Sequence, residues 1–507
     1  MNPTQPNILF IMADQITASA LPVYGNRTVK APHLESLAKQ GVVFDSAYCN
    51  SPLCAPSRFV LMTGRLPAKI GAYDNAAELP ADVPTYAHYL RNAGYKTALS
   101  GKMHFCGPDQ LHGFEERFTS DIYPADFGWA VNWDEPEKRP TWYHDMSSVT
   151  QAGPCVRSNQ LDYDDEVGFH ARRYLYDQAR STDKRPFCLT VSMTHPHDPY
   201  AIPEEYWNRY RDEDIDLPKV RLEESQRDPH SKRLRALYQA DTTECDDNQI
   251  RNARRAYYGA ISYVDDQVGA LLKTLKETGL DKNTLIVFSG DHGDMLGERD
   301  LWYKMSWFEG SARVPLIVCA PDRYQPARVN ASVSTLDLLP TLVEMATGAA
   351  PRLATDIEGR SLVPHLTADG GHDEVIGEYM GEGTVAPVMM IRRGDWKYIY
   401  CPADPDQLYN LASDPDELSN LATDPEFGSV LQAFREEAAK RWDMEKIQQE
   451  VLDSQRRRRL VAEALSKGRV TSWDYQPWFD ASQQYMRNTV DLGDLERQAR
   501  LPVVPGA

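Results

Sequence analysis

The sequence predicts an α/β fold built on a large, mostly parallel sheet flanked by helices. Short apolar runs at 7–12, 97–99, 187–193 and 284–289 alternate with helical segments, of which 258–279 is the clearest. The runs are apolar along their length rather than alternating, as expected for strands buried on both faces. A chain of 507 residues is long enough to bury a large core and to carry a smaller appendage.

The pattern changes near the C-terminus. Closely spaced strand-like runs at 375–380, 388–392 and 396–401 favour a small antiparallel sheet, and long charged helical segments follow. We therefore expect three parts. They are a main domain over 1–370, a small antiparallel sheet subdomain over 371–426 and a helical C-terminal extension over 427–507.

Polar side chains follow the apolar runs at the points where the predicted strands end. The first run leads to Asp14 and Gln15, and the run at 284–289 leads to Asp291 and His292. Other residues at or shortly after strand ends are Lys102, His104, His195, His197 and Lys304. Open α/β sheets bind ligands at the carboxyl ends of their strands, so these clusters together predict one site, although each alone is more often a satisfied surface group.

One cysteine, Cys54, lies four residues before Arg58 at the start of a helix-like run. A helix that begins here directs the positive end of its dipole at a bound anion, and Arg58, one turn on, can hold the same anion with its planar guanidinium. A cysteine is often only a small buried hydrophobe. The strand-end clusters favour the interpretation that Cys54 is a nucleophile.

The spacing of Cys54, Pro56, Arg58, Thr63 and Gly64 resembles the signature of type I sulfatases, within the alkaline phosphatase-like superfamily. The resemblance implies that a formylglycine-generating enzyme, binding transiently, oxidises Cys54 to formylglycine. The hydrated aldehyde would attack the sulfur of a small-molecule sulfate ester, and loss of the proton from its second hydroxyl would expel inorganic sulfate. The main domain would then be the catalytic domain.

The same resemblance implies a divalent cation. Its ligands would be Asp14, Cys54, Asp291 and His292, with Gln15 as a further one. Oxygen donors favour a hard ion, so Ca²⁺ is expected, with Mg²⁺ or Mn²⁺ as alternatives. Gln15 and His292 replace the aspartate and asparagine usual in the family, and this softer, less negative ligand set favours Mn²⁺ more than in a typical member.

Catalytic roles follow from charge and from the family pattern. Three cations would surround the sulfate oxygens: Arg58, Lys102 and Lys304. By the resemblance, His197 would protonate the departing alcohol, helped by Lys102, and His104 would take the proton of the hydrate. His195 is the alternative acid, but the second histidine of the pair carries this role in the family.

Longer blocks are similar to choline sulfatases along essentially the whole chain. They include 73–78, 84–88, 100–117, 121–129, 164–167, 293–299, 308–315 and 473–477. A quaternary ammonium group donates no hydrogen bond, so proteins bind it with aromatic faces and negative charge. The family's cation pocket matches Trp129 and Glu382, with Asn75, Tyr123 and His144 as further candidates. The resemblance implies hydrolysis of choline-O-sulfate, which would supply choline for nutrition or for glycine betaine.

This chain has Asp145 after His144, where the family usually has asparagine. An added carboxylate would strengthen cation binding or shift the preference to another alcohol. Two other functions stay open. One is a phosphonate monoester or phosphodiester hydrolase on the same fold, and the other is a non-catalytic binder of sulfate esters, which would arise if Cys54 were never oxidised.

Charge and composition restrict the partners and the compartment. A net charge of -19 disfavours nucleic acid, and the basic run 456–459 is expected to be a solvated or salt-bridged helix face. The first 20 residues show no signal peptide or membrane span, and the 8 cysteines suit reduced thiols. We therefore expect a cytoplasmic enzyme that does not bind membranes.

The end of the chain is rich in aromatic residues, namely Trp473, Tyr475, Trp478, Phe479 and Tyr485. So many aromatic side chains in a tail predict a partner surface. By the resemblance to choline sulfatases, this surface would join neighbouring subunits into a homotetramer. The alternative is that the tail packs on its own domain.

Overall fold

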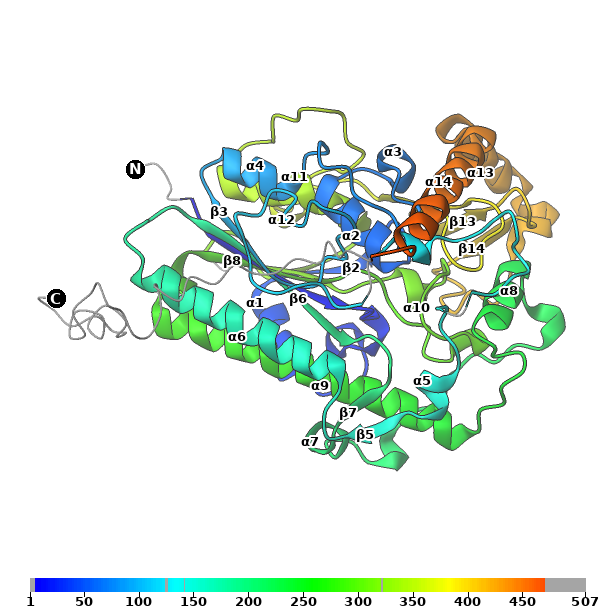
Figure 1. Cartoon of the computed structure of the whole chain (residues 1–507), viewed down its shortest axis with the longest axis horizontal. Helices are drawn as coiled ribbons and strands as arrows, with labels where there is room; N and C mark the ends of the chain where they lie inside the picture. Colours follow the sequence, from blue (N-terminus) through cyan, green and yellow to red (C-terminus); the bar gives the residue numbers. More distant parts are fainter. Residues whose placement is uncertain (1–4, 124–125, 141, 321, 470–507) are drawn as a thin grey trace, which may run out of the picture.

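The computed structural model describes residues 5–123, 126–140, 142–320 and 322–469. An eight-stranded sheet forms its centre (Figure 1). The strands are β1 (Asn7–Asp14), β2 (Val42–Tyr48), β3 (Lys96–Gly101), β4 (Glu116–Arg117), β6 (Phe187–Pro196), β8 (Thr284–Gly290), β9 (Leu316–Cys319) and β10 (Ala327–Ser334). Their order is β10-β2-β9-β8-β1-β6-β3-β4. Only β9 runs antiparallel to its neighbours, so the predicted mostly parallel sheet is confirmed.

Helices cover both faces of this sheet. The longer helices before the small sheet are α1 (Pro32–Gln40), α2 (Cys54–Thr63), α4 (Tyr86–Asn92), α6 (Asn159–Arg180), α8 (Pro229–Leu237), α9 (Asp247–Thr278) and α11 (Leu338–Thr347), of which α8 lies near the second sheet described below (Figure 1). Helices α6 and α9 run side by side along one face, and α2, α4 and α11 lie on the other (Figure 1). Residues 256–265 of α9 are buried on all sides, and in its C-terminal half buried residues recur every three or four positions, at Val264, Val268, Leu271 and Leu275, as in a helix with one apolar stripe.

Short elements connect these layers. They are α3 (Pro67–Ile70), the 3-10 turn η3 (Phe127–Trp129), α5 (Ser147–Thr150), β5 (Gly153–Cys155), β7 (Ala201–Pro203), α7 (Glu204–Trp207), α10 (Glu309–Ala312) and α12 (Val363–Leu366). Several of them lie in the long connections that follow the strand ends, which is where loops of this fold carry functional side chains.

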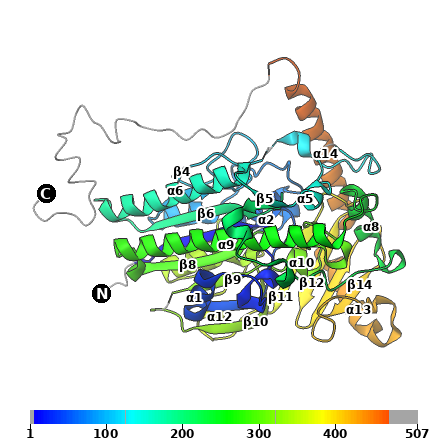
Figure 2. The same cartoon turned by 90° about the horizontal axis from the view of Figure 1, so that it is seen from below.

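A second, antiparallel sheet follows in the chain, as predicted. Its strands pair in sequence order: β11 (Glu374–Tyr379), β12 (Val388–Arg393), β13 (Trp396–Tyr400) and β14 (Gln407–Asn410). Helices α13 (Gly428–Arg441) and α14 (Met444–Leu465) come next, and Figure 2 shows them at the same end of the molecule as this small sheet. The three-part division at 370 and 426 stays a prediction.

A separate apolar cluster, here called the C-terminal core, joins the small sheet to these helices. It consists of Tyr73, Val131, Trp133, Met380, Met389, Ile391, Tyr398, Leu408, Leu431, Phe434, Ala438, Trp442, Ile447 and Val451. Three members, Tyr73, Val131 and Trp133, come from loops between elements of the large-sheet part of the chain. The C-terminal helices are therefore packed against those loops as well as against the small sheet.

Among the described helices, none combines the length and apolar character that a membrane span requires. The aromatic tail that we predict to contact neighbouring subunits, including Trp473 and Tyr485, lies outside the described residues.

Candidate active site

The parallel register brings distant residues to one edge of the sheet. Strands β1 and β8 pair in parallel, with Met12 opposite Ser289 and Ala13 opposite Gly290, so Asp14 and Asp291 emerge next to each other. Strand β6 pairs with β1 on its other side and β3 pairs with β6. The loops after these two strands carry His197 and Lys102 to the same edge.

Four of the predicted metal ligands form one cluster. The ligand atoms of Asp14, Cys54, Asp291 and His292 all lie within 4.8 Å of one another, and all four residues are buried. His292 Nε2 is 3.2 Å from Cys54 Sγ. Two carboxylates and an imidazole suit a divalent cation, so the donor set fits the group that the sequence implies.

Charged neighbours keep this cluster in a ligating state. Burial opposes the ionisation of Asp14, but Lys102 and Arg58 together hold the pKa of its carboxyl well below the usual value. Lys102 Nζ lies 2.5 Å from Asp14 Oδ2. Burial also lowers the pKa of His292, which leaves a neutral imidazole able to donate its lone pair.

Gln15 lies beside the cluster. Its Oε1 accepts a hydrogen bond from Lys304 Nζ at 2.8 Å, and its Nε2 donates to Asp294 Oδ2 at 2.6 Å. Its backbone N–H donates to Asp291 Oδ1. The amide is thus oriented from both ends, and its role as a metal ligand stays a prediction.

Arg58 lies behind the cluster, in the fully buried helix α2 that begins at Cys54. Its Nε and Nη2 donate to Asp291 and Asp14, both at 2.9 Å. Its Nη1 donates to the Lys102 carbonyl and to Ser192 Oγ. We expected the guanidinium to hold the sulfate directly, but here its fork fixes the two carboxylates, and Arg58 is absent from the cavity wall described next.

A cavity of about 280 Å³ opens at Cys54. Predicted catalytic residues on its wall are Lys102, His104, His197 and Lys304. Neither ring nitrogen of His104 has a hydrogen-bond partner among the described residues. Burial and the nearby Lys102 charge lower the pKa of His104 to about 3, so its imidazole is neutral at physiological pH.

His197 and Lys304 form a buried pair in this wall. His197 Nδ1 donates to the Asp198 carbonyl at 2.5 Å, and its Nε2 accepts from Lys304 Nζ at 2.7 Å. His195 is absent from the wall and instead contacts Asp164, with 2.6 Å between its Nδ1 and the carboxylate. Of the two candidate acids, only His197 therefore reaches the cavity.

Aromatic rings and one carboxylate line another part of the cavity. The Trp129 ring, on η3, stacks on Trp142 with centroids 5.6 Å apart and planes inclined by 4°. Trp142 contacts Tyr143 edge to face at 4.3 Å. Glu382 follows β11, and its Oε2 is buried without a hydrogen-bond partner among the described residues. Burial and the negative charge of Asp74 raise the pKa of Glu382 to about 7.

The remaining predicted pocket residues also reach the cavity. Asn75 Oδ1 accepts from the backbone N–H of Ala55, the residue after Cys54, at 3.0 Å. Tyr123 lies with its ring centroid 5.0 Å from Lys102 Nζ. His144 Nδ1 lies 3.4 Å from Asp198 Oδ2.

Asp145 also lines the cavity, but its side chain is exposed and already engaged. Its Oδ1 accepts from the backbone N–H of Ser147 at 2.8 Å, at the start of α5. The bonds from Ser147 also lower the pKa of Asp145. Trp142 and Tyr143 were missed from the sequence, although an aromatic pair directly before His144 was a usable signal.

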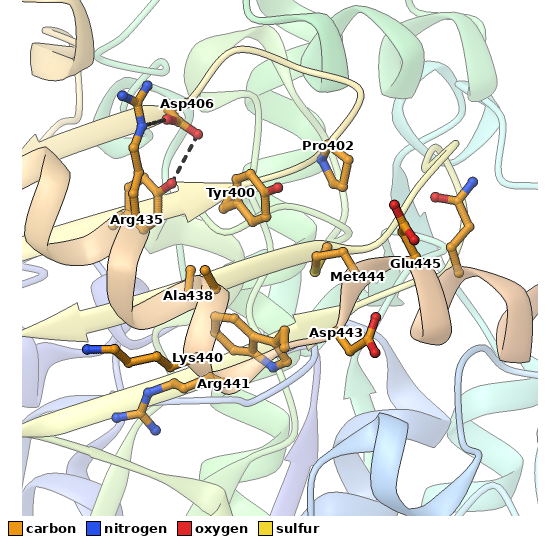
Figure 3. A pocket seen from close by; sticks show the side chains of 14 residues that line it. Tyr400, Pro402, Asp406, Arg435, Ala438, Lys440, Arg441, Asp443, Met444 and Glu445 are labelled. Carbon is orange, nitrogen blue, oxygen red and sulfur yellow. Dashed lines mark hydrogen bonds and ion pairs between the residues drawn. The ribbon is translucent and has the colours of Figure 1, made fainter.

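A larger hollow of about 970 Å³ lies between the small sheet and helices α13 and α14. Figure 3 shows side chains of several kinds around it, among them Tyr400, Met444 and an Arg435–Asp406 ion pair. None of the predicted site residues lines this hollow. The smaller cavity, where Cys54, two lysines and the histidines converge, is the candidate active site.

Comparison with known families agrees with this geometry. The Sulfatase family profile matches residues 6–349, and the profile of the choline sulfatase enzyme C terminal matches 449–501. The C-terminal profile of N-sulphoglucosamine sulphohydrolase matches 297–443.

Individual proteins are also similar to the chain. It is 47% identical over 511 residues to choline-sulfatase of Rhizobium meliloti (strain 1021), with 99% of each chain covered. It is 26% identical to an arylsulfatase of Clostridium perfringens, over 80% of this chain and 90% of the other. The crystal structure of phosphonate monoester hydrolase of Agrobacterium radiobacter superposes with a TM-score of 0.70 at 24% identity, covering 86% of this chain and 95% of the other. This last likeness shows the fold alone.

Proposed function

Because the chain belongs to the sulfatase family and is a sulfuric ester hydrolase, we propose that it cleaves choline-O-sulfate to choline and inorganic sulfate. One observation supports choline as the alcohol of the sulfate ester. The Glu382 carboxylate, whose Oε2 has no hydrogen-bond partner among the described residues, shares a cavity with the stacked Trp129 and Trp142 rings. Aromatic faces beside a carboxylate are what a quaternary ammonium ion needs, since it cannot donate a hydrogen bond.

The charges of the cavity also suit a zwitterionic ester. Lys102 and Lys304 offer ammonium groups to the sulfate, and Glu382 offers a carboxylate to the cationic alcohol. The cavity, at about 280 Å³, is at the small end of the range for ligand sites. This size favours a small ester over a sulfated polysaccharide.

Two groups that the family implies would complete the site. We propose that Cys54 is converted to formylglycine, whose hydrate supplies a hydroxyl nucleophile at the start of α2. Asp14, Cys54, Asp291 and His292 would hold a divalent cation, with Ca²⁺ expected before Mn²⁺ or Mg²⁺, and Gln15 is a further candidate ligand. When bound, the cation supplies positive charge that stabilises the sulfate oxygens.

Side chains of the protein would bind the sulfate, transfer protons and position the two carboxylates. Lys102 and Lys304 orient the sulfate and offset the negative charge of its oxygens. Lys304 Nζ, 2.7 Å from His197 Nε2, can pass a proton to that nitrogen, and His197 then gives this proton to the leaving alkoxide. His104 would accept the proton that the hydrate loses when sulfate is expelled, because its ring nitrogens are free of other partners among the described residues. Arg58 holds Asp14 and Asp291 in place.

Sulfate release by protein coexpressed with a formylglycine-generating enzyme tests the proposal. The substrates are choline-O-sulfate, its neutral carbon analogue 3,3-dimethylbutyl sulfate, an aryl sulfate and a phosphonate monoester. We expect kcat/KM to be highest for choline-O-sulfate. A preference for the neutral or aryl sulfate would discard the choline assignment, and a preference for the phosphonate would favour the phosphonate hydrolase alternative.

The nucleophile needs a separate test. Mass spectrometry of the peptide that contains Cys54, in active protein, should show the mass loss that accompanies conversion to formylglycine. An intact thiol in active protein would contradict the proposed nucleophile, and an intact thiol in inactive protein would support the non-catalytic alternative.

We also propose a homotetramer in the cytoplasm, with the tail after residue 469 in the subunit contacts. Light scattering of the full chain and of a chain ending at residue 469 tests the assembly. If the full chain and the shortened chain form particles with the same number of subunits, the tail has no role in assembly.

A further inference from the structure

Helix α14 carries one arginine that does not face solvent. We expected the run 456–459 to be solvated or salt-bridged, and Arg456 does pair with Asp134 at the surface. Arg458 is salt-bridged as well, but it is only 8% exposed, and its guanidinium binds both carboxylate oxygens of Asp74, which is 0% exposed. The Nη2 to Oδ2 distance is 3.0 Å. Such a two-pronged pair fixes geometry more strictly than a single ionic contact.

Asp74 connects this arginine to two loops of the candidate cation pocket. Its Oδ2 accepts from the backbone N–H of Val131 at 3.3 Å, two residues after Trp129. Its Oδ1 accepts from the Ala76 N–H, which closes the turn around Asn75. Removing the guanidinium would therefore loosen the supports of Trp129 and Asn75 together.

A second contact of α14 reaches the Glu382 turn. Gln455, which is 0% exposed, accepts from the backbone N–H of Trp133 at 2.9 Å. The Trp133 indole N–H then donates to Thr384 Oγ1 at 3.3 Å, two residues after Glu382. Helix α14 thus contacts the supports of the Trp129 loop, of Asn75 and of Glu382.

The sulfate-binding side has different supports. Lys102 and Arg58 are anchored by Asp14, and Lys304 by Gln15 and His197. Within the described residues, the hydrogen bonds and ion pairs of Gln455 and Arg458 reach none of these groups.

We propose that Arg458 is a positioning residue that sets the preference for a cationic alcohol. Through Asp74 it fixes Asn75 and the Trp129 loop, and Gln455 extends the same support to the Glu382 turn. The inference rests on the proposed function, because it assigns Arg458 to the cation-binding side of that site. It adds a determinant on the C-terminal helix that never touches the substrate.

The test compares Arg458→Lys with Arg457→Lys, a matched change at the exposed neighbouring position. Lysine keeps the charge near Asp74 and loses the two-pronged geometry. We expect Arg458→Lys to raise KM for choline-O-sulfate about 10-fold, because the cation contacts would be misplaced. Its kcat/KM for 3,3-dimethylbutyl sulfate should stay within about 2-fold of wild type, since the sulfate-binding side keeps its anchors. Arg457→Lys should match wild type on both substrates.

A second variant tests the same support at another residue, so that the result does not depend on the folding of Arg458→Lys alone. Gln455→Met keeps the side-chain volume and removes the acceptor for Trp133, so it should shift KM in the same selective way. Equal losses on both substrates, or unchanged KM in both variants, would overturn the inference. If wild type itself shows no preference for choline-O-sulfate over the neutral analogue, the proposed function fails, and this inference falls with it.

Discussion

Replacing Glu382 by glutamine should weaken binding of a cationic substrate while leaving a neutral one nearly unaffected. The carboxylate is buried, and its Oε2 lacks a hydrogen-bond partner among the described residues. A quaternary ammonium about 4–5 Å away would gain roughly 3–4 kcal/mol at an effective dielectric constant of about 20. Partial protonation and desolvation reduce that figure, so we expect KM for choline-O-sulfate to rise about 100-fold in Glu382→Gln.

The pH dependence of the wild type gives an independent check. Burial and Asp74 raise the pKa of Glu382 to about 7, while Lys304 and His292 act in the opposite direction. Only the ionised carboxylate attracts the cation, so binding is strong above this pKa and weakens as the pH falls through it. Between pH 7 and about pH 6 the ionised fraction falls roughly fivefold, and KM for choline-O-sulfate should rise by about the same factor.

The assay measures initial rates of sulfate release against pH, with 3,3-dimethylbutyl sulfate as the reference substrate. In the ratio of the two KM values, the pH dependence caused by groups that act on both esters cancels. In Glu382→Gln this ratio should lose its pH dependence. A ratio that titrates alike in wild type and Glu382→Gln would refute the role of the carboxylate.

Three further outcomes are expected. Trp129→Ala should raise KM for choline-O-sulfate about 10-fold or more, given about 2 kcal/mol for a desolvated cation–π contact. An equal rise in KM for an aryl sulfate would contradict a role of Trp129 in binding the cation. His197→Ala should slow alkyl sulfates about 100-fold or more and aryl sulfates far less, because a phenolate leaves without an acid; a uniform loss in steady-state rates would count against this role. A chelator should abolish sulfate release and lower Tm, and the ion that restores both identifies the natural metal; unchanged Tm and rate would argue against a metal at Asp14 and Asp291.

The strand ends were predictable because a parallel sheet has only one carboxyl edge. Asp14 and Asp291 each follow a continuous apolar run, and adjacent parallel strands must then place them together. The helical start at Cys54 was predictable from the helix-like run that follows it, and a helix N-terminus at that point favours anion binding.

Contacts that depend on tertiary packing were not predictable. Nothing local to Arg58 indicates that its donors bind Asp14 and Asp291 rather than a ligand. Nothing local to Arg458 distinguishes it from its exposed neighbour Arg457, because Asp74 lies 384 positions away in the chain. A run of four arginines predicts a solvated or salt-bridged helix face, and only the folded chain shows that one of them is buried against Asp74.

Because the C-terminal core is separate from the main core, substitutions in it can alter the cation-binding side without displacing the strand ends that carry Asp14. Residues of β1 such as Phe10 and Ile11 belong to the main core, where a change in volume would displace the strand ends that carry Asp14. Val131 and Met380 belong to the C-terminal core and border the Trp129 loop and the Glu382 turn instead. A lineage could drift toward a new alcohol by repacking this second core while its ester-cleaving groups stay fixed. Directed evolution of such an enzyme would best begin with a library at these border positions.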